Sequence, residues 1–323
     1  MTAINYLNGF QDLAETFDKT KAYQNDIVCK DVAEWRPEWL ESIKPESNKL
    51  SMLFDRWDDE FNGKLRSKLV PVIGYGGTKK SLLALNIAYH NITMGLGKCL
   101  YSSMEMGATE VINRLMDLHC EPLKYNPHYE IEYHHNVTKK INAEMFYRDH
   151  FAKAFNGNFY ITENTALLAD HYDKLLSKFK EQGKKIDIVI VDGLAGMGGN
   201  GSETELYSRH SKELKDLANK WKVLVFLICH VSKGGKKTDR DLSDKVRSSE
   251  KIIDNSDFYI TSSLFENKKI SEHGEFDREH GNCRLVNKRG SGSVIDVIYK
   301  FDSLRLRMEQ TDLSLKDFDN GGL

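Results

Sequence analysis

A glycine-rich turn between an apolar run and a helical run carries the clearest chemical signal of the sequence. Residues 70–73 are Val-Pro-Val-Ile, and the helical run begins at Ser81. A strand, a turn and a helix in this order bring successive backbone N–H groups and a helix N-terminus around one anion. The turn therefore predicts a phosphate-binding site, whose residues are Gly74, Gly76, Gly77, Thr78, Lys79, Lys80 and Ser81. An ordinary turn between a strand and a helix is the alternative interpretation.

The turn follows the phosphate-loop motif G-x-x-x-x-G-K-[ST] with one departure. Gly74, Lys80 and Ser81 fit the motif, whereas Lys79 stands where the second glycine is expected. In such loops the lysine holds the β- and γ-phosphates of a nucleotide and the hydroxyl binds Mg²⁺, so ATP and Mg²⁺ are the expected ligands. A left-handed backbone at Lys79 costs about 1–2 kcal/mol. Attraction between its ammonium group and the phosphates can offset this strain, or can hold the product and slow turnover.

Two carboxylates follow apolar runs that predict buried strands. Asp192 ends the run 188–191, and Glu105 comes shortly after the run 99–103. Since α/β sheets bind their ligands beyond the carboxyl ends of the strands, Asp192 is a candidate Mg²⁺ ligand and Glu105 a candidate base for the attacking water. Two other interpretations stay open: Asp192 caps the turn that follows it, and Glu105 stabilises the first turn of a helix over 108–117 through the helix dipole.

Short β-branched and apolar runs alternate with helical stretches from Leu69 onward, which predicts an α/β fold. The runs that predict strands are 69–73, 99–103, 158–162, 186–191, 223–229 and 258–261. Continuous apolar runs such as IDIVIV are typical of strands buried on both faces, as in a parallel sheet covered by helices. One amphipathic helix is expected over 203–221. Near the end of the chain, the runs that predict a β-hairpin or meander are 283–286, 294–301 and 305–309.

The composition excludes several classes of protein. Of the 323 residues, 40% are hydrophobic and 29% charged, and only 5 are proline, which favours a packed globule over a disordered chain. The longest apolar run, 223–229, is far shorter than the roughly 20 residues of a membrane-spanning helix, so no membrane association is expected. The N-terminus carries no secretory signal and the cysteines are scattered, as in a reduced cytoplasmic protein. A net charge of -2 provides no global attraction to nucleic acid.

The order of these motifs resembles that of DnaB-type hexameric replicative helicases. The run SLLALNIAYHNITMGLGKCLYSSMEMGATEVINRL is similar to their phosphate-loop helix and the strand that follows it. The runs IDIVIVDGLAGMGG, HSKELKDLANKWKV and LVFLICHVSK resemble their Walker B strand, the next helix and the sensor strand. Residues 254–257 and 286–290 match later landmarks, so the resemblance covers about residues 50–310.

This resemblance implies a RecA-like P-loop NTPase core with a mostly parallel central sheet covered by helices and a C-terminal β-hairpin. It implies a homo-oligomeric ring, hexameric in this family, that hydrolyses ATP between subunits and moves 5′–3′ along single-stranded DNA in its channel. The expected domains are an N-terminal arm or linker over 1–45, the ATPase domain over 46–310 and a flexible acidic tail over 311–323.

The short N-terminal arm resembles phage or plasmid forms of these helicases. A primase, a polymerase and a helicase loader are the candidate partners, although so short an arm leaves coupling to a primase open. The acidic and apolar residues of the tail suit docking on a basic groove of a polymerase. Plain disorder of the tail is the alternative.

The resemblance also assigns roles to individual residues. The matches are Lys80 and Ser81 to the Walker A pair, Asp192 to the Walker B acid and Glu105 to the catalytic glutamate. His230 matches the sensor of the γ-phosphate, with a buried histidine at a strand end as the alternative. Arg289 matches the arginine finger that reaches the nucleotide of the neighbouring subunit, with a solvated turn as the alternative. The family often has Lys-x-Arg here, and since this chain has Asn287-Lys288-Arg289, its lysine finger is displaced or absent.

A basic segment after the sensor strand is the candidate DNA-binding loop. Residues 233–247 carry six basic and three acidic side chains, and the family places a channel loop here. Contacts from lysine or arginine to phosphate need no particular base sequence, which suits a motor that moves over any DNA. The candidate contacts are Lys233, Lys236, Lys237 and Arg240, and the glycine-rich residues 193–204 can line the same channel. A solvated basic loop is the alternative.

The sequence leaves two other functions open. A RecA-like recombinase would pair homologous strands on an open filament and would not unwind a forked duplex. An ATP-binding replication scaffold would have weakened hydrolysis through Lys79. The joint presence of Glu105, His230 and Arg289 weighs against the scaffold, because an inactive site needs none of them.

Overall fold

A nine-stranded sheet forms the centre of the computed structural model, within the residues that the structure describes. Those residues are 49–61, 63–119, 151–231, 237–240, 242, 250–266, 276–303 and 306–316. They fall in the second of two units of the chain, Asn48–Leu323. The predicted arm over 1–45 lies outside the described residues.

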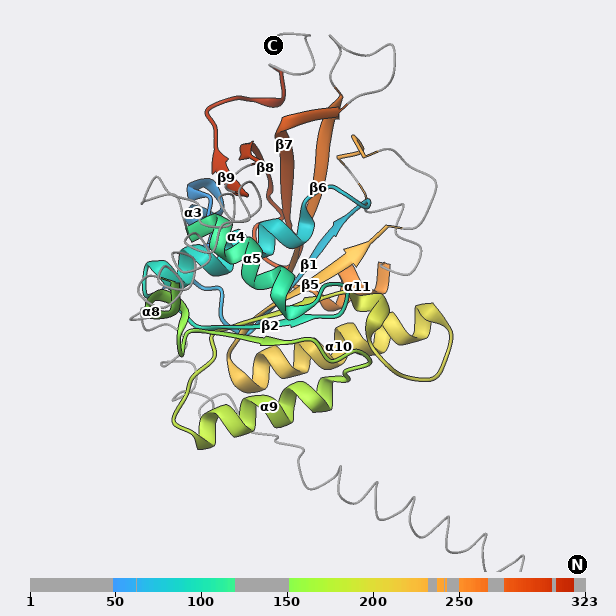
Figure 1. Ribbon diagram of the computed structural model, residues 1–323. Coiled ribbons are helices and arrows are strands. Elements are labelled where there is room, and N and C mark those ends of the chain that lie inside the picture. Colours follow the sequence, from blue (N-terminus) through green and yellow to red (C-terminus); the bar gives the residue numbers. More distant parts are fainter. Residues whose placement is uncertain are drawn as a thin grey trace, which may run out of the picture. The chain divides into compact units, whose positions relative to one another are not determined.

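The sheet is parallel in its larger part and antiparallel at its C-terminal edge. Its strands are β1 Lys68–Gly74, β2 Cys99–Ser103, β3 Phe159–Thr162, β4 Ile188–Asp192, β5 Leu224–His230, β6 Phe258–Glu266, β7 Phe276–Asn287, β8 Val294–Asp302 and β9 Arg307–Gln310. Their order is β3-β2-β4-β5-β1-β6-β7-β8-β9, with parallel pairing as far as β6 and antiparallel pairing beyond it (Figure 1). This arrangement confirms the predicted mostly parallel sheet and the C-terminal hairpin.

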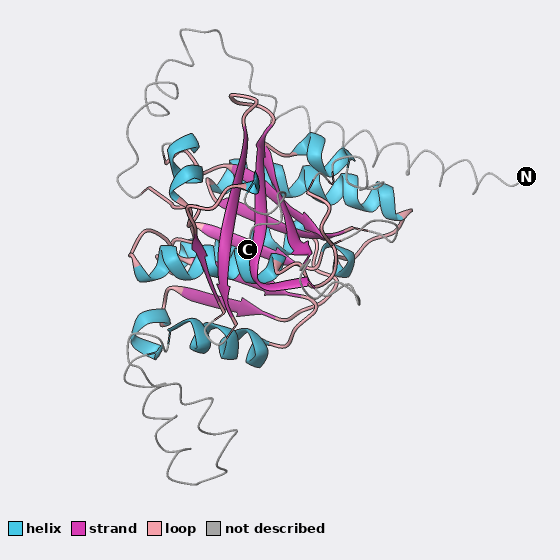
Figure 2. Ribbon diagram, turned by 90° about the horizontal axis from the view of Figure 1, so that it is seen from above, coloured by secondary structure: helices cyan, strands magenta, loops and turns pink. Residues whose placement is uncertain are grey.

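Helices cover both faces of the parallel strands, as the continuous apolar runs predict. One face packs against α3 Asp55–Phe61, α4 Lys80–Thr93, α5 Ala108–His119 and α8 Ala152–Phe155. The other packs against α9 Ala169–Glu181, α10 Glu203–Trp221 and α11 Glu250–Asn255 (Figures 1 and 2). All five residues of β4 are buried, and the side chains of its four apolar residues, 188–191, enter the two apolar clusters in alternation.

The helix α10 has the bounds that its sequence predicts. Its N-terminus carries a capping box, in which the Ser202 side chain accepts a hydrogen bond from the Glu205 backbone N–H and the Glu205 carboxylate accepts one from the Ser202 backbone. The helix ends at Trp221, and the C-cap residue Lys222 has a left-handed backbone with φ 53°. The buried face of α10 includes Leu214 and Leu217.

Two strands of the antiparallel part, β6 and β7, are longer than the sequence predicts. β6 continues to Glu266 and β7 begins at Phe276 instead of near residue 283, and these two residues pair across the ladder. The first half of β7 contains the run His280-Gly281-Asn282, which has no regular apolar alternation. Its place in the sheet depends on backbone pairing with β6, and a pattern of side chains carries little information about such pairing.

None of the helices among the described residues is both long enough and apolar enough to span a membrane.

Candidate nucleotide-binding site

The glycine-rich turn connects the end of β1 to the start of α4. Gly74 is the last residue of β1, and a Cβ atom there would stand 2.4 Å from Thr78 Oγ1 and 2.7 Å from the carbonyl oxygen of Ser262. Only glycine therefore allows the loop to fold back this closely. Thr78 closes the turn by donating its backbone N–H and its hydroxyl to the carbonyl of Tyr75, at 3.3 and 3.0 Å. The backbone N–H groups at the start of α4 consequently face the same edge of the sheet as the loop.

Lys79 adopts the left-handed conformation that favours glycine, with φ 64° and ψ 23°. Its ammonium nitrogen lies 3.8 Å from the ring centroid of Phe301 and 5.8 Å from that of Tyr299, both in β8. A cation–π contact contributes about 0.5–2 kcal/mol, which is comparable with the left-handed strain of about 1–2 kcal/mol. The sequence suggested phosphate attraction as the source of this offset, whereas the structure provides an aromatic contact.

Lys80 brings a buried positive charge to the loop. The residue is 4% exposed, and its Nζ donates a hydrogen bond to the carbonyl of Tyr75 at 2.8 Å. Burial lowers the pKa of Lys80 to about 8, although the nearby carboxylates of Glu105 and Asp192 partly oppose this shift. A buried ammonium group of this kind is stabilised by an anionic ligand, and phosphate is the ligand that the surrounding loop suits.

Ser81 and Asp192 form a hydroxyl–carboxylate pair beside the loop. Ser81 Oγ donates to Asp192 Oδ1 at 2.8 Å, and the Tyr101 hydroxyl donates to Asp192 Oδ2. Asp192 is 1% exposed, and burial raises its pKa while the two hydrogen bonds lower it in part. The Asp192 side chain therefore faces Ser81 and Tyr101, which argues against the alternative in which it caps the next turn.

The donor set around Ser81 fits Mg²⁺. The described residues contain no group of three or more His, Cys, Asp or Glu side chains that could hold a metal ion by themselves. Mg²⁺ commonly takes one or two protein oxygens and completes its shell with phosphate oxygens and water. Ser81 and Asp192 would be the protein ligands in such a site.

The side chains of Glu105 and His230 contact each other at the same edge. Glu105 Oε1 lies 3.0 Å from His230 Nε2, and the two side chains are 46% and 42% exposed. His230 is thus accessible rather than buried. Glu105 lies in the turn before α5, and the carboxylate of Glu163 accepts the hydrogen bond from the backbone N–H of Ala108 at the helix start. Glu163 therefore supplies a carboxylate at the start of α5, where the alternative interpretation placed Glu105.

Strand register explains why these side chains meet. Gly74 of β1 pairs in register with His230 of β5, and Ser103 of β2 pairs in register with Asp192 of β4. The carboxyl ends of β1, β2, β4 and β5 therefore share one edge of the sheet. β2 follows the phosphate loop in sequence but is not the neighbour of β1, because β4 and β5 lie between them. Glu105 reaches the site across this gap through the turn after β2.

Arg289 lies away from this cluster. It belongs to the turn between β7 and β8, two residues after Asn287, which pairs with Phe258 at the start of β6. Because β6 runs parallel to β1, this turn lies at the amino ends of the parallel strands, opposite the phosphate loop at their carboxyl ends. The seven residues of β1 separate the two ends by about 20 Å. The Arg289 guanidinium donates to the carbonyl of Asp254 at 2.6 Å. The chain that carries Arg289 does not bring it to its own phosphate loop.

The predicted DNA contacts fall only partly within the described residues. Lys233 and Lys236 lie outside them. Arg240 places its guanidinium 5.5 Å from the ring centroid of Phe265. Lys237 lies at the phosphate loop, with Nζ 3.2 Å from the position that a Cβ on Gly77 would occupy.

Three residues of the site were missed from the sequence. Tyr101 and Glu163 were not singled out, and neither was Ser262, whose hydroxyl donates to the carbonyl of Thr78 in the phosphate loop. The available signal was chemical: Tyr101 is a polar side chain in a predicted strand, Ser262 directly follows the predicted strand 258–261, and buried hydroxyls usually have a hydrogen-bonding partner. Which partner each one finds depends on the strand order, which the sequence pattern does not provide.

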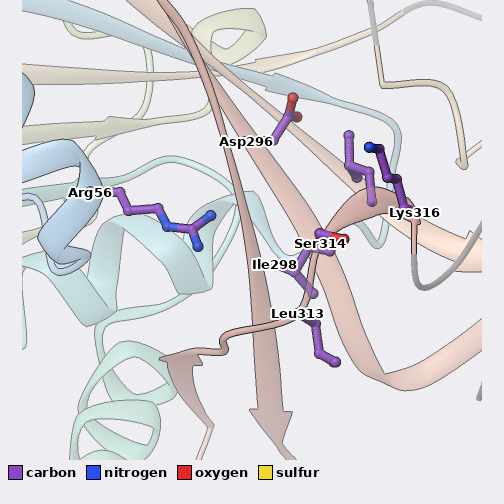
Figure 3. Close-up of a pocket in the computed structure, with 7 residues that line it drawn as sticks. Arg56, Asp296, Ile298, Leu313, Ser314 and Lys316 are labelled. Atoms are coloured by element: carbon purple, nitrogen blue, oxygen red, sulfur yellow. The ribbon is translucent and has the colours of Figure 1, made fainter.

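A separate hollow of about 400 Å³ lies at the antiparallel edge of the sheet (Figure 3). Its lining residues are Arg56, Asp296, Ile298, Leu313, Ser314, Leu315 and Lys316. Thr311 attaches the start of the C-terminal segment to β8, because its backbone N–H and its hydroxyl both donate to the carbonyl of Ile298, at 2.9 and 3.0 Å. None of the predicted nucleotide-binding side chains lines this hollow. Flexibility of the tail over 311–323 stays a prediction.

The sheet topology and the site together identify the chain as having a RecA-like P-loop fold. Its marks are the glycine-rich turn after a central parallel strand, the buried Lys80, the Ser81–Asp192 pair and the carboxylate of Glu105 at one edge. Residues 50–310 match the family described as "DnaB-like helicase C terminal domain", and the chain belongs to this family.

Solved structures agree with this assignment of the fold. One structure, described as an "ATPase Domain", is 19% identical with a TM-score of 0.66, over 88% of this chain and 100% of that one. The structure entitled "The Structure Of A DnaB-Like Replicative Helicase And Its Interactions With Primase" is 18% identical with a TM-score of 0.67, over 95% of this chain and 74% of that one. No curated protein matches the sequence.

Proposed function

We propose that this chain is an ATP-driven replicative DNA helicase that works as a ring of identical subunits. The observation that supports this most directly is the division of the catalytic groups between two edges of the sheet. Lys80, Asp192 and Glu105 meet at one edge, and Arg289 extends from the other. A complete site then requires two copies of the chain, as in a head-to-tail ring.

Each side chain of the site has a role in phosphoryl transfer. Lys80 and the backbone N–H groups of the loop hold the β- and γ-phosphates, and Ser81 and Asp192 hold Mg²⁺, which neutralises phosphate charge when bound. Glu105 takes a proton from the attacking water as the new bond to the γ-phosphorus forms and the bond to the bridging oxygen breaks, which yields ADP and phosphate. His230 orients Glu105 and senses the γ-phosphate. Arg289 of the next subunit stabilises the charge that develops.

The proposed substrate is single-stranded DNA in the ring channel, with movement 5′–3′. Lys233, Lys236 and Arg240 would contact DNA phosphates without reading base sequence. The ring would be a hexamer, and its partners in replication would be a primase, a polymerase or a helicase loader. Membership of the helicase family supports each of these assignments.

The experiment that tests the proposal measures ATP hydrolysis and unwinding of a forked duplex, together with negative-stain imaging of the particle. Lys80→Ala is expected to lose nucleotide binding. Glu105→Gln is expected to keep binding and to lose about 10²- to 10⁴-fold in hydrolysis, because the base is removed while the phosphate contacts stay. Glu309→Gln, which changes an exposed carboxylate in β9, is the matched control and is expected to behave as wild type.

Strand exchange between homologous DNAs without fork unwinding would support the recombinase instead. ATP binding without hydrolysis by the wild-type chain would support the scaffold. Particles that stay monomeric with ATP and DNA would contradict the ring.

A further inference from the structure

The residues at 237–240 are attached to the edge of β6 beside the phosphate loop. β1 pairs with β6 only at Ile260 and Thr261, so the same edge of β6 is open to other partners from Ser262 onward. Leu264 donates its backbone N–H to the carbonyl of Lys237 at 2.9 Å, and the Thr261 hydroxyl donates to the carbonyl of Arg240 at 2.8 Å. These two hydrogen bonds fix the main chain of Lys237 where β1 ends and the loop begins.

The side chain of Lys237 extends from this anchor to the loop. Its Nζ is 3.2 Å and its Cε 3.9 Å from the position of a Cβ on Gly77, whose φ is +81°. Gly77 is the fourth residue of the loop, counted from Gly74. The ammonium group therefore lies against the middle of the turn whose N–H groups face an anion. β6 also contacts the loop through the Ser262 hydroxyl, which donates to the carbonyl of Thr78.

A second cation at this position changes the charge balance of the nucleotide site. Lys80 is buried and donates a hydrogen bond to the carbonyl of Tyr75, and the Lys79 ammonium group contacts the aromatic rings of β8. Lys237 is half-buried and its ammonium group lies close to the loop glycine. A polyphosphate held by the loop would lie within reach of the Lys237 ammonium group, and a charge-assisted hydrogen bond would form between them.

We propose that Lys237 binds the phosphates of the nucleotide held in its own subunit, and that the basic segment after β5 thus supplies a cation to ATP as well as to DNA. This inference rests on the proposed nucleotide site. It gives the segment a direct response to nucleotide: binding draws Lys237 onto the phosphates, and release reverses this movement.

The test compares nucleotide affinity in the absence of DNA. A fluorescent non-hydrolysable ATP analogue and fluorescent ADP are titrated against the full chain, the Lys237→Ala and Lys237→Arg variants, and Lys251→Ala. Lys251 is an exposed lysine of α11, at the opposite edge of the sheet, and its variant removes an equal charge. Lys237→Ala is expected to weaken binding about tenfold, with Lys237→Arg close to wild type and Lys251→Ala unchanged. Equal affinity of Lys237→Ala and wild type would overturn the inference.

A salt titration distinguishes a DNA contact from a nucleotide contact. Single-stranded DNA affinity is measured against salt with the ATP analogue saturating. The slope of the logarithm of DNA affinity against the logarithm of salt concentration is expected to be the same for Lys237→Ala and wild type. A slope smaller by about 0.7, with unchanged nucleotide affinity, would assign Lys237 to DNA and overturn the inference. Lys80→Ala separates the two proposals: if it also binds nucleotide normally, the nucleotide site is wrong, whereas if only Lys237→Ala binds normally, the inference alone fails.

Discussion

Lys80 combines a positive charge with nearly complete burial, so its charge depends on the ligand. Burial lowers its pKa to about 8, and bound phosphates would raise that pKa again. Near pH 7 the group is mostly charged before ATP binds. Above pH 8 a growing fraction is neutral, and ATP binding must then take up a proton.

We therefore expect nucleotide binding to be coupled to proton uptake in alkaline solution. At pH 8.5 the uptake should approach about three quarters of a proton per site, and ATP affinity should fall as the pH rises from 7 to 9. Calorimetric titrations in buffers of different ionisation enthalpy measure the uptake. A binding enthalpy independent of the buffer at pH 8.5 would contradict the lowered pKa.

Lys79 combines left-handed strain with a cation–π contact, and two substitutions separate these effects. Lys79→Gly relieves the strain and loses the contact with Phe301, so its stability should stay within about 1 kcal/mol of wild type. Lys79→Ala loses the contact but keeps the strain, and should be less stable than Lys79→Gly by about 1 kcal/mol. Urea denaturation of the three chains measures the difference.

The same variants test the loop as a catalytic element. Lys79→Gly should still bind ATP, because the ammonium group that it removes faces the rings of β8 in the wild type. Lys80→Ala should not bind ATP. Equal hydrolysis by wild type, Lys79→Gly and Lys80→Ala would refute the assignment of the loop. A Lys79→Ala chain as stable as Lys79→Gly would contradict the strain.

At the scale of elements, Asp257 joins α10 to the starts of β1 and β6. Its carboxylate accepts hydrogen bonds from Lys215 Nζ in α10 at 2.6 Å and from the backbone N–H of Leu69 at 3.2 Å. Burial alone would raise the pKa of Asp257, but the bond from Lys215 and the charges of Lys215 and Lys68 hold it below the ordinary value of 3.8. The ion pairs therefore stabilise the fold above pH 3.8, and this contribution is lost as the pH falls through the lower native pKa.

Asp257→Asn should lose about 2–4 kcal/mol of unfolding free energy at pH 7, because it leaves a partly buried Lys215 without its charge partner. The gap between wild type and variant should narrow below about pH 4, since the wild-type carboxylate is then protonated as well. Urea denaturation at several pH values between 7 and 3 measures both free energies. A gap that does not change with pH would show that the carboxylate acts through shape and not through charge.

The parts of the fold that the sequence predicted are those with a strong apolar pattern. β4, β5 and α10 have continuous or helical periodicity, and the structure has all three at the expected positions. The side chains at the carboxyl ends of such strands, Asp192 and His230, were predictable for the same reason. Strand order was not predictable, because it is set by how the crossover helices pack and not by any one strand.

Predictions failed where backbone pairing replaces side-chain pattern. The first half of β7 pairs with β6 without regular alternation. The contacts of Lys79 with Phe301, and of Lys237 with the loop at Gly77, join residues far apart in sequence. Each depends on the position of β6 and β8 beside β1, which the local sequence does not determine.

At the scale of the whole molecule, the proposed ring requires the two ends of the parallel strands to carry complementary halves of one site. The phosphate loop is at one edge and the turn of Arg289 at the other, so in a head-to-tail ring each interface joins a loop to the turn of the next subunit. In the single chain the Arg289 guanidinium donates to the carbonyl of Asp254, and the proposal requires it to turn to a neighbour's nucleotide in the ring. Two inactive chains can then complement each other.

We expect an equimolar mixture of Lys80→Ala and Arg289→Ala chains to regain hydrolysis that neither has alone. An interface that joins the loop of an Arg289→Ala chain to the turn of a Lys80→Ala chain contains both native residues. Random assembly produces about a quarter of such interfaces, so activity should approach about a quarter of wild type if sites act independently. Steady-state hydrolysis after co-refolding or subunit exchange measures the recovery. If Arg289 acted on its own subunit's nucleotide, every site in the mixture would lack one residue, and the mixture would be as inactive as its components.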